Sequence, residues 1–343
     1  MNAWRLGFLF SILFVACGAQ AHTPLFPRDN HQFTAAFVIG NPAKSWVAYS
    51  AVRTAAQRDY YRFQASQGDE IRIKLLAARN PAETGFLPSF VLAGPGLVRR
   101  DSLPPGLGVP PEYGSILVPG IQPKAASYEP FAQGWFYDLA NLSVHAPAAG
   151  VYHLIVFDTS GRTGGYAVTV GYLEGWTPME LIALPWNIRR IQLWEGQNLI
   201  DGLIPFLATL ALGSLWLFLR RSRGKTPRTL SQGFAAFSFL AFLGSAAGSI
   251  HQMLLASRVA PIHRSDLIIT LIAAAIPILL GITALRYGLR ISGGDLMLWR
   301  IALIAVAIIG VLLFTGLYLG PALCLIAALA KSSEKIERRR LES

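Results

Sequence analysis

The residues with the clearest potential for chemistry are histidines, and two of them flank a predicted turn. His145 and His153 lie on either side of residues 146–150, which contain the proline and glycine typical of a hairpin loop. If the flanking strands pair, both imidazoles lie on one face as diagonal neighbours, roughly 7–8 Å apart at Cα. That separation would allow both to bind one metal ion. Because Ile155 and Phe157 share the parity of His153, the alternative is that this face is core and His153 is a structural histidine.

A second candidate metal site lies at the predicted mature N-terminus. Residues 1–21 combine Arg5, an apolar core and an Ala19-Gln20-Ala21 cleavage site, which predicts a signal peptide. Cleavage makes His22 the first residue. Its amine and imidazole, with His31 as partner, then resemble the copper-binding histidine brace of lytic polysaccharide monooxygenases and of periplasmic copper carriers. The resemblance implies copper as the ion, which suits these nitrogen ligands. The alternative is that both histidines are polar residues of a flexible arm.

Other chemistry finds little support in the sequence. There are two cysteines, Cys17 in the leader and Cys324 in the last apolar run, so the exported region has no disulfide pair. A lipoprotein signal, with Cys17 lipidated, competes with cleavage after Ala21. There is no G-x-S-x-G, HExxH, P-loop or G-x-G-x-x-G motif. We therefore assign no catalytic or cofactor-binding residue and favour a protein that is not an enzyme.

Short strands separated by Gly, Pro and Asn must position the histidines of residues 22–175. In residues 70–75, for example, Ile71, Ile73 and Leu75 alternate with charged residues. Similar runs predict strands at residues 46–50, 59–65, 70–75, 90–93, 142–145, 151–157 and 166–171. Strands at this spacing are typical of an antiparallel β-sandwich. About 150 residues suffice for one such core.

Four runs of this region carry a family resemblance, at residues 59–63, 68–73, 150–156 and 164–170. Their order resembles the bacterial pre-peptidase C-terminal type of β-sandwich over about residues 45–172. The resemblance implies a jelly-roll-like, non-catalytic module of secreted proteins, with a binding or spacing role. Residues 80–135 interrupt it with a long segment rich in Pro and Gly. Such a segment either faces a partner or forms an ordered cover on one sheet.

A helical linker is predicted over residues 176–198. Thr177 and Pro178 fit the N-cap and first position of a helix. We predict one or two short helices over residues 178–194, broken near Pro185 and lying on the outer leaflet. Aromatic and basic residues would anchor them among lipid headgroups: Trp176, Trp186, Arg189, Arg190 and Trp194. The alternative is that they are core helices beneath the sandwich.

Transmembrane helices are predicted within residues 199–331, at about 199–219, 229–255, 267–285 and 301–319. The loop after the first span is strongly basic, which favours a cytoplasmic position. Gly244 and Gly248 form a small-residue face for helix packing. Residues 332–343 form a basic tail, which four spans place outside. A short fifth segment near residues 322–330 is the alternative that returns the tail to the inside.

These patterns predict a multidomain protein of the bacterial-type cytoplasmic membrane, with an extracytoplasmic β-sandwich followed by an all-α bundle. The formal charge is +11, but the basic residues lie largely beside apolar spans, which argues against nucleic acid and for lipid contact. The favoured function is an accessory protein whose exported domain binds a protein partner or small ligand. The alternatives are copper or other metal binding through His22, and a channel or transporter with a sensor domain. The last is disfavoured because the spans contain almost no ionisable residues, with only Asp201 and His251 near their ends.

Overall fold

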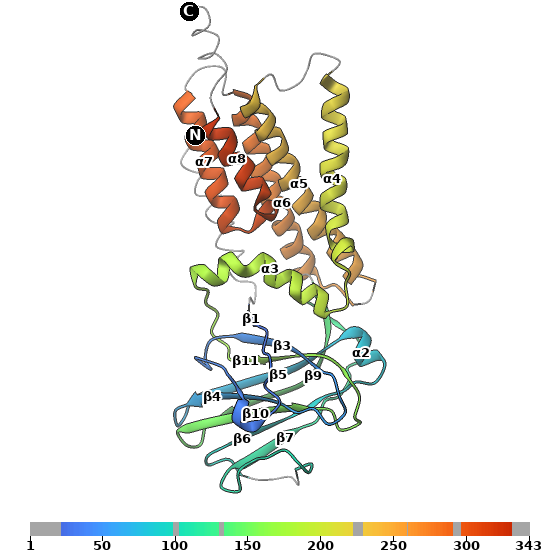
Figure 1. The fold of residues 1–343 in the computed structure, drawn as a ribbon, viewed down its shortest axis with the longest axis vertical. Coiled ribbons are helices and arrows are strands. Elements are labelled where there is room, and N and C mark those ends of the chain that lie inside the picture. Colours follow the sequence, from blue (N-terminus) through green and yellow to red (C-terminus); the bar gives the residue numbers. More distant parts are fainter. Residues whose placement is uncertain are drawn as a thin grey trace, which may run out of the picture.

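The protein consists of a sheet-rich N-terminal part and a helical C-terminal part (Figure 1). A computed structural model describes residues 22–98, 103–129, 134–221, 229–258, 260–290 and 296–330. The predicted signal peptide and basic tail lie outside these residues, as does most of the first basic loop. One helix, α3 (Pro178–Trp194), lies between the two parts and runs across the ends of the other helices (Figure 1).

The described strands form two sheets. The first has the order β1 (Thr23–Leu25), β3 (Trp46–Val52), β11 (Gly164–Val170), β5 (Glu70–Ala78), β9 (Gly134–His145) and β8 (Ser127–Glu129). The second has the order β2 (Phe37–Val38), β4 (Asp59–Ala65), β10 (Gly150–Phe157), β6 (Ser89–Gly94) and β7 (Gly114–Val118). A short helix α2 (Arg79–Glu83) and a single 3-10 turn η1 (Phe33–Ala35) join strands. The pairs are antiparallel except β1–β3 and β2–β4.

One hydrophobic core lies between the two sheets, and alternation along the strands builds it. Ile71, Ile73 and Leu75 of β5 are buried, as are Phe63 of β4 and Leu154 of β10. The intervening Arg72 and Lys74 are exposed, as the period-two pattern predicts. All seven predicted strands are confirmed. β9 is much longer than predicted, because it begins at Gly134 and includes the aromatic run Trp135, Phe136 and Tyr137.

The helix α3 is continuous from residue 178 to residue 194, so the predicted break near Pro185 is wrong. A proline removes only one intrahelical N–H donor, and packing of the helix on both parts of the molecule can compensate for that loss. The predicted N-terminus is confirmed. The Thr177 hydroxyl accepts from the Glu180 N–H, and the Glu180 carboxylate accepts from the Thr177 N–H.

The C-terminal part contains α4 (Leu199–Arg221), α5 (Leu230–Ala256), α6 (Arg264–Arg290), α7 (Leu296–Leu312), η2 (Thr315–Tyr318) and α8 (Leu319–Leu329). Among the described residues, three helices are long and apolar enough to cross a membrane, at Gly202–Arg220, Leu230–Ala256 and Arg264–Leu289. They correspond to the first three predicted spans. This composition is consistent with a membrane protein.

The predicted fourth span at residues 301–319 differs from the structure. α7 ends at Leu312, and the chain reverses into α8, which packs beside α7 and α5 (Figure 1). The reversal uses left-handed backbone at Phe314, Leu317 and Tyr318. The ring of Phe242 on α5 lies against three glycines of this segment, Gly310, Gly316 and Gly320. A Cβ at any of these positions would lie 3.0–3.3 Å from the ring, tighter than ordinary van der Waals contact, so glycine favours this close reversal of the chain.

The predicted packing face of α5 is present at one of its two glycines. A Cβ at Gly244 would come within 3.2 Å of the Phe206 Cα, so α4 lies directly against this position. Gly248 has no atom of the described residues within 4 Å of its Cβ position. The two helices therefore pack closely at Gly244, whereas Gly248 makes no such contact.

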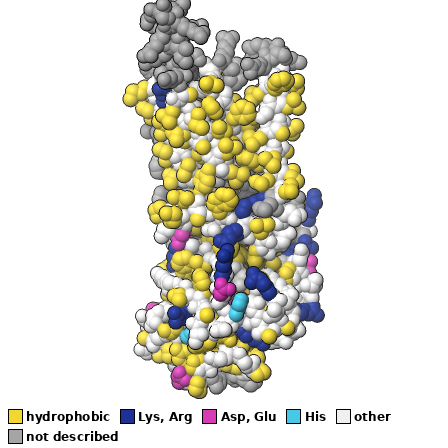
Figure 2. Space-filling model, viewed as in Figure 1, with side chains coloured by type: hydrophobic (Ala, Val, Ile, Leu, Met, Phe, Trp, Pro, Cys, Tyr) yellow, Lys and Arg dark blue, Asp and Glu magenta, His cyan; other side chains and the backbone are white. Residues whose placement is uncertain are grey.

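The sheet-rich and helical parts share one core. Met253 and Ala256 of α5, with Ala260 of the following loop, belong to the same buried cluster as the sandwiched strands. The Tyr128 hydroxyl of β8 lies 3.2 Å from the Thr270 hydroxyl of α6. Hydrophobic side chains cover the visible surface of the helices, whereas charged residues gather on the β domain and at its boundary (Figure 2).

Candidate functional site

His145 and His153 lie in different sheets, so the hairpin predicted between them is wrong. His145 ends β9 and pairs with Glu70 of β5, whereas His153 of β10 pairs with Arg62 of β4 and Ala93 of β6. Residues 146–149 cross from one sheet to the other. The spacing of the two histidines is typical of a hairpin, but long-range pairing of each strand decides its neighbours. The structure therefore does not bring this pair together.

His153 is a buried histidine on the outer face of the second sheet. Its ring stacks on Phe33 with 4.0 Å between centroids, and Tyr113 lies beside it. Ile155 and Phe157 belong to the same covered face, as the structural alternative expected. The His153 Nδ1 atom finds no hydrogen-bond partner among the described residues. Burial, with the nearby charge of Arg62 as a smaller cause, lowers the pKa of His153.

We expect His153 to make the folded state less stable in mild acid. Its folded pKa lies below the ordinary 6.5, so the unfolded chain binds a proton first as pH falls through that value. The free energy of unfolding therefore decreases from pH 7 towards pH 5. His153→Phe keeps an aromatic ring stacked on Phe33 and removes the group that takes up the proton. Thermal unfolding at both pH values should show a smaller acid loss for the variant, and an unchanged loss would contradict the assignment.

His22 and His31 contact different parts of the β domain. The His22 Nδ1 atom contacts the Ser45 hydroxyl, next to β3. Burial, and to a lesser extent the charge of Lys74, lowers the pKa of His22. His31 lies 2.7 Å from a carboxylate oxygen of Asp59 on β4. Each imidazole thus has a protein partner of its own, whereas a copper brace requires both to face one ion.

Asp59 is the centre of a buried polar network that sequence reasoning missed. Its carboxylate is fully buried and accepts hydrogen bonds from the Gln57 amide at 2.7 Å and the Tyr166 hydroxyl at 2.6 Å. Ser50 donates to it at 3.1 Å, and His31 is a further partner. These partners satisfy the buried carboxyl oxygens and tie the two sheets together. A lone Asp at the start of an apolar strand is the only sequence signal of the network.

Among the described residues, no group of three or more His, Cys, Asp and Glu side chains could hold a metal ion. We expect His22→Ala to leave the copper content of the purified mature protein unchanged after copper loading and dialysis. Elemental analysis, with mass spectrometry to establish the mature N-terminus, measures this. About one copper per chain that is lost on His22→Ala would establish the brace instead.

The junction between α3 and the β domain is held by several side-chain contacts. The Trp194 indole packs edge-on against Tyr49 at 5.0 Å, and its N–H donates to the Ser50 carbonyl at 2.9 Å. The Arg190 guanidinium lies 3.5 Å from the Phe26 ring centroid. These two predicted headgroup anchors therefore contact protein, because β3 and the N-terminal segment offer aromatic partners that a linear pattern cannot show.

The other predicted anchors have different environments. Trp186 is 74% exposed, as a lipid-facing residue would be. The Arg189 guanidinium contacts the Gln192 side chain and lies over Gly202 of α4. Trp176 precedes α3 and is partly buried. At the other end of α3, Glu180 and Lys44 form an ion pair at 2.7 Å.

Glu195, which follows α3, is a buried carboxyl that sequence reasoning also missed. It is 5% exposed and accepts from the Trp135 N–H at 3.1 Å and from the Gln197 amide at 2.9 Å. Gly134 lies so close that a Cβ there would overlap the carboxyl. Burial raises the pKa of Glu195 well above its usual range, with Glu129 adding to the effect and the two hydrogen bonds opposing it.

The described residues between 80 and 135 belong to the β domain and do not form a separate insertion. They supply β6, β7 and β8, which lie in both sheets. Two connections nevertheless expose large apolar side chains. Val98, after β6, is 65% exposed, and Ile121, after β7, is 69% exposed. The described part of this segment therefore combines ordered strands with loops that expose apolar side chains.

Comparisons with known proteins leave the function open. No family model matches the chain, and no curated protein matches it. Among solved structures, the chain is similar to the pre-peptidase C-terminal domain of collagenase from Bacillus anthracis. The identity is 18% and the TM-score 0.22, and the match covers 39% of this chain and 91% of that one. These values support a distant β-sandwich resemblance and carry no functional argument.

Proposed function

We propose that this protein is a membrane-anchored accessory protein that uses its β domain, a jelly-roll-like sandwich outside the cytoplasm, to bind or assemble a partner. In this proposal α4–α8 lie in the cytoplasmic membrane and α3 lies on its outer surface. The protein has no catalytic activity of its own. Two observations support the membrane position. Three helices are long and apolar enough to span a bilayer, and basic residues follow the first of them and lie at the end of the third.

The observation that carries this proposal is the fixed junction between the two parts. Trp194 and Glu195 attach one end of α3 to β3 and β9, and Glu180 attaches the other end to Lys44. The core also continues from the strands into Met253 and its neighbours. A domain that only needs to sample its surroundings can be tethered by a flexible linker. A fixed orientation suits a protein that presents one surface to a partner in the same membrane.

Exposed side chains of α3 support its position at the membrane surface. Met179, Ile182, Trp186 and Leu193 are between 45% and 74% exposed. Their spacing of three, four and seven residues places them along one side of the helix. An apolar stripe with Trp and neighbouring Arg residues is typical of helices that lie in the headgroup region.

Site-specific photo-crosslinking tests the accessory function. A photoreactive amino acid is placed at Val98 or Ile121 in the full chain, and irradiation is carried out in native membranes. Gln67, exposed in the turn after β4, is the matched control position. A discrete adduct of reproducible mass from Val98 or Ile121, absent at Gln67, supports a partner surface. Irradiated chains that remain free of discrete adducts at all three positions contradict it.

A further inference from the structure

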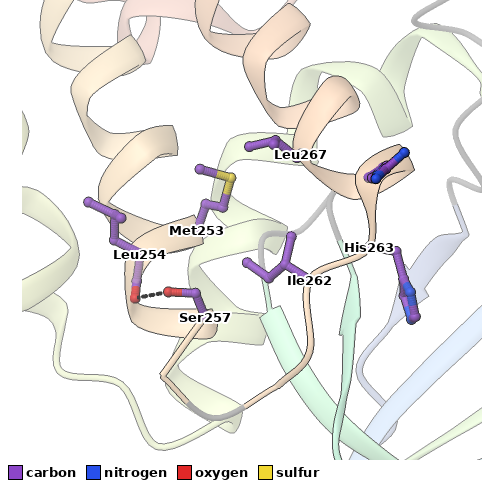
Figure 3. A pocket seen from close by; sticks show the side chains of 7 residues that line it. Met253, Leu254, Ser257, Ile262, His263 and Leu267 are labelled. Atoms are coloured by element: carbon purple, nitrogen blue, oxygen red, sulfur yellow. Dashed lines mark hydrogen bonds between the residues drawn. The ribbon is translucent and has the colours of Figure 1, made fainter.

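An open apolar groove lies where α5 ends and α6 begins. Its volume is about 300 Å³. Met253, Leu254 and Ser257 line it from the end of α5, and Ile262, His263, Arg264 and Leu267 line it from the loop and α6. Figure 3 shows that Met253, Ile262 and Leu267 point towards one another across the groove. The Ser257 hydroxyl donates to the Leu254 carbonyl, so the polar atom of that wall is already satisfied.

The rim of the groove carries positive charge. Arg264 and His263 are exposed at its mouth, and Arg258 is exposed on the same loop. The nearby acid, Asp266, accepts from the His263 N–H at 3.0 Å and from the Ser265 hydroxyl at 3.3 Å, and so caps α6. Two guanidinium groups against one carboxylate leave a net positive rim, which is complementary to an anionic headgroup.

The groove opens onto the apolar surface of the helices. Leu254 is 53% exposed at one side of it, and Leu267, Ile268 and Leu271 continue from it along α6 with exposures between 40% and 57%. The loop between α5 and α6 packs against the β domain, because its residue Ala260 is part of the same hydrophobic core as the strands. The groove therefore lies at the end of α5 and the start of α6, next to the β domain. Figure 2 shows that the apolar surface of the helices gives way to a more polar surface at the β domain. A phospholipid crosses the same boundary between its acyl chains and its phosphate.

We propose that this groove binds one anionic phospholipid. An acyl chain lies between Met253 and Leu267 and continues along the exposed side of α6. The phosphate lies at the rim, where the Arg264 guanidinium pairs with its oxygens and His263 is a further donor. This inference rests on the proposed membrane position, and it adds that one lipid binds at a defined place, beside the shared core of the two parts.

Photo-labelling of the full chain tests this site. The protein is reconstituted in phosphatidylcholine nanodiscs that contain a minor fraction of diazirine-bearing phosphatidylglycerol, irradiated, digested and mapped by mass spectrometry. We expect labelling to concentrate on peptides from residues 253–271. Arg264→Ala should reduce labelling there about fivefold, as expected for removal of one basic contact. Leu267→Trp should reduce it by filling the groove, and Arg286→Ala, at the other end of α6, should leave it unchanged.

The outcomes separate this inference from the membrane proposal. Labelling spread evenly over α4, α5 and α6, and unaffected by Arg264→Ala and Leu267→Trp in folded protein, overturns the lipid site alone. Equal labelling by a diazirine phosphatidylcholine probe overturns the preference for an anionic headgroup. Labelling absent from all helices overturns the membrane position itself. Thermal unfolding of each variant establishes that a loss of labelling does not reflect a loss of folding.

Discussion

Trp194→Ala is expected to destabilise the attachment of α3 to the β domain by about 3 kcal/mol, the range found when large aromatic side chains are truncated. The substitution removes the edge-on packing on Tyr49 and the hydrogen bond to the Ser50 carbonyl. If the β domain, of about 150 residues, unfolds as one unit, its midpoint of thermal unfolding should fall by roughly 10 °C. Circular dichroism of the full chain in detergent, followed through the β-domain transition, measures the effect.

A matched control for this prediction lies on the same helix. Trp186 is 74% exposed, so Trp186→Ala removes the same side chain without removing a buried contact. We expect a change within about 0.5 kcal/mol, as for surface substitutions. Trp194→Phe keeps an aromatic ring against Tyr49 and loses the N–H donor, and loss of the hydrogen bond should cost about 1 kcal/mol. Equal effects of the two alanine substitutions would show that the junction does not stabilise the protein.

Glu195→Gln is expected to stabilise the protein at pH 8 and to have little effect near pH 5. Burial raises the pKa of Glu195 well above 4.5, so the folded chain keeps its proton at pH values where the unfolded chain has lost it. The free energy of unfolding therefore decreases as pH rises above 4.5. Glutamine keeps an acceptor for the Trp135 N–H and cannot ionise. The midpoint of thermal unfolding, measured from pH 5 to pH 8, should vary less for the variant.

Two further variants test the cause of this pH dependence. Glu195→Ala leaves the Trp135 N–H without its acceptor and should cost about 1–3 kcal/mol near pH 5. The cost should be smaller at pH 8, because the variant no longer carries the buried acid that destabilises the unmodified protein there. Glu180→Gln should act in the opposite sense to Glu195→Gln. Burial tends to raise the pKa of Glu180, but Lys44 and the Thr177 cap together lower it, so its stabilisation is present at neutral pH and lost in acid. A Glu195→Gln profile parallel to that of the unmodified protein would refute the buried-acid assignment.

The strands could be predicted from the sequence because alternation is a local property. Ile71, Ile73 and Leu75 show their side of β5 without knowledge of any partner strand. The N-terminus of α3 was equally accessible, because Thr177, Pro178 and Glu180 form a cap within four residues. The first three apolar helices followed from length and hydrophobicity alone.

The candidate sites depended on long-range pairing and could not be predicted in the same way. His145 and His153 are close in sequence, yet their strands pair with Glu70 and with Arg62 in separate sheets. Asp59 and Glu195 look like ordinary acids in the sequence. They become the centres of buried networks only because Tyr166 and Trp135, distant in the chain, supply hydrogen-bond donors.

Local periodicity and composition by themselves determined the two-part organisation of this protein, the strands of its β domain and the three long apolar helices. Only the tertiary structure decided that the segment after α7 turns back against the Phe242 ring of α5, that Trp194 contacts Tyr49, and that the two parts share one core. The reason is physical. Hydrophobic pattern fixes which side of an element is buried, whereas its partner is chosen by packing and hydrogen bonding between segments far apart in the chain.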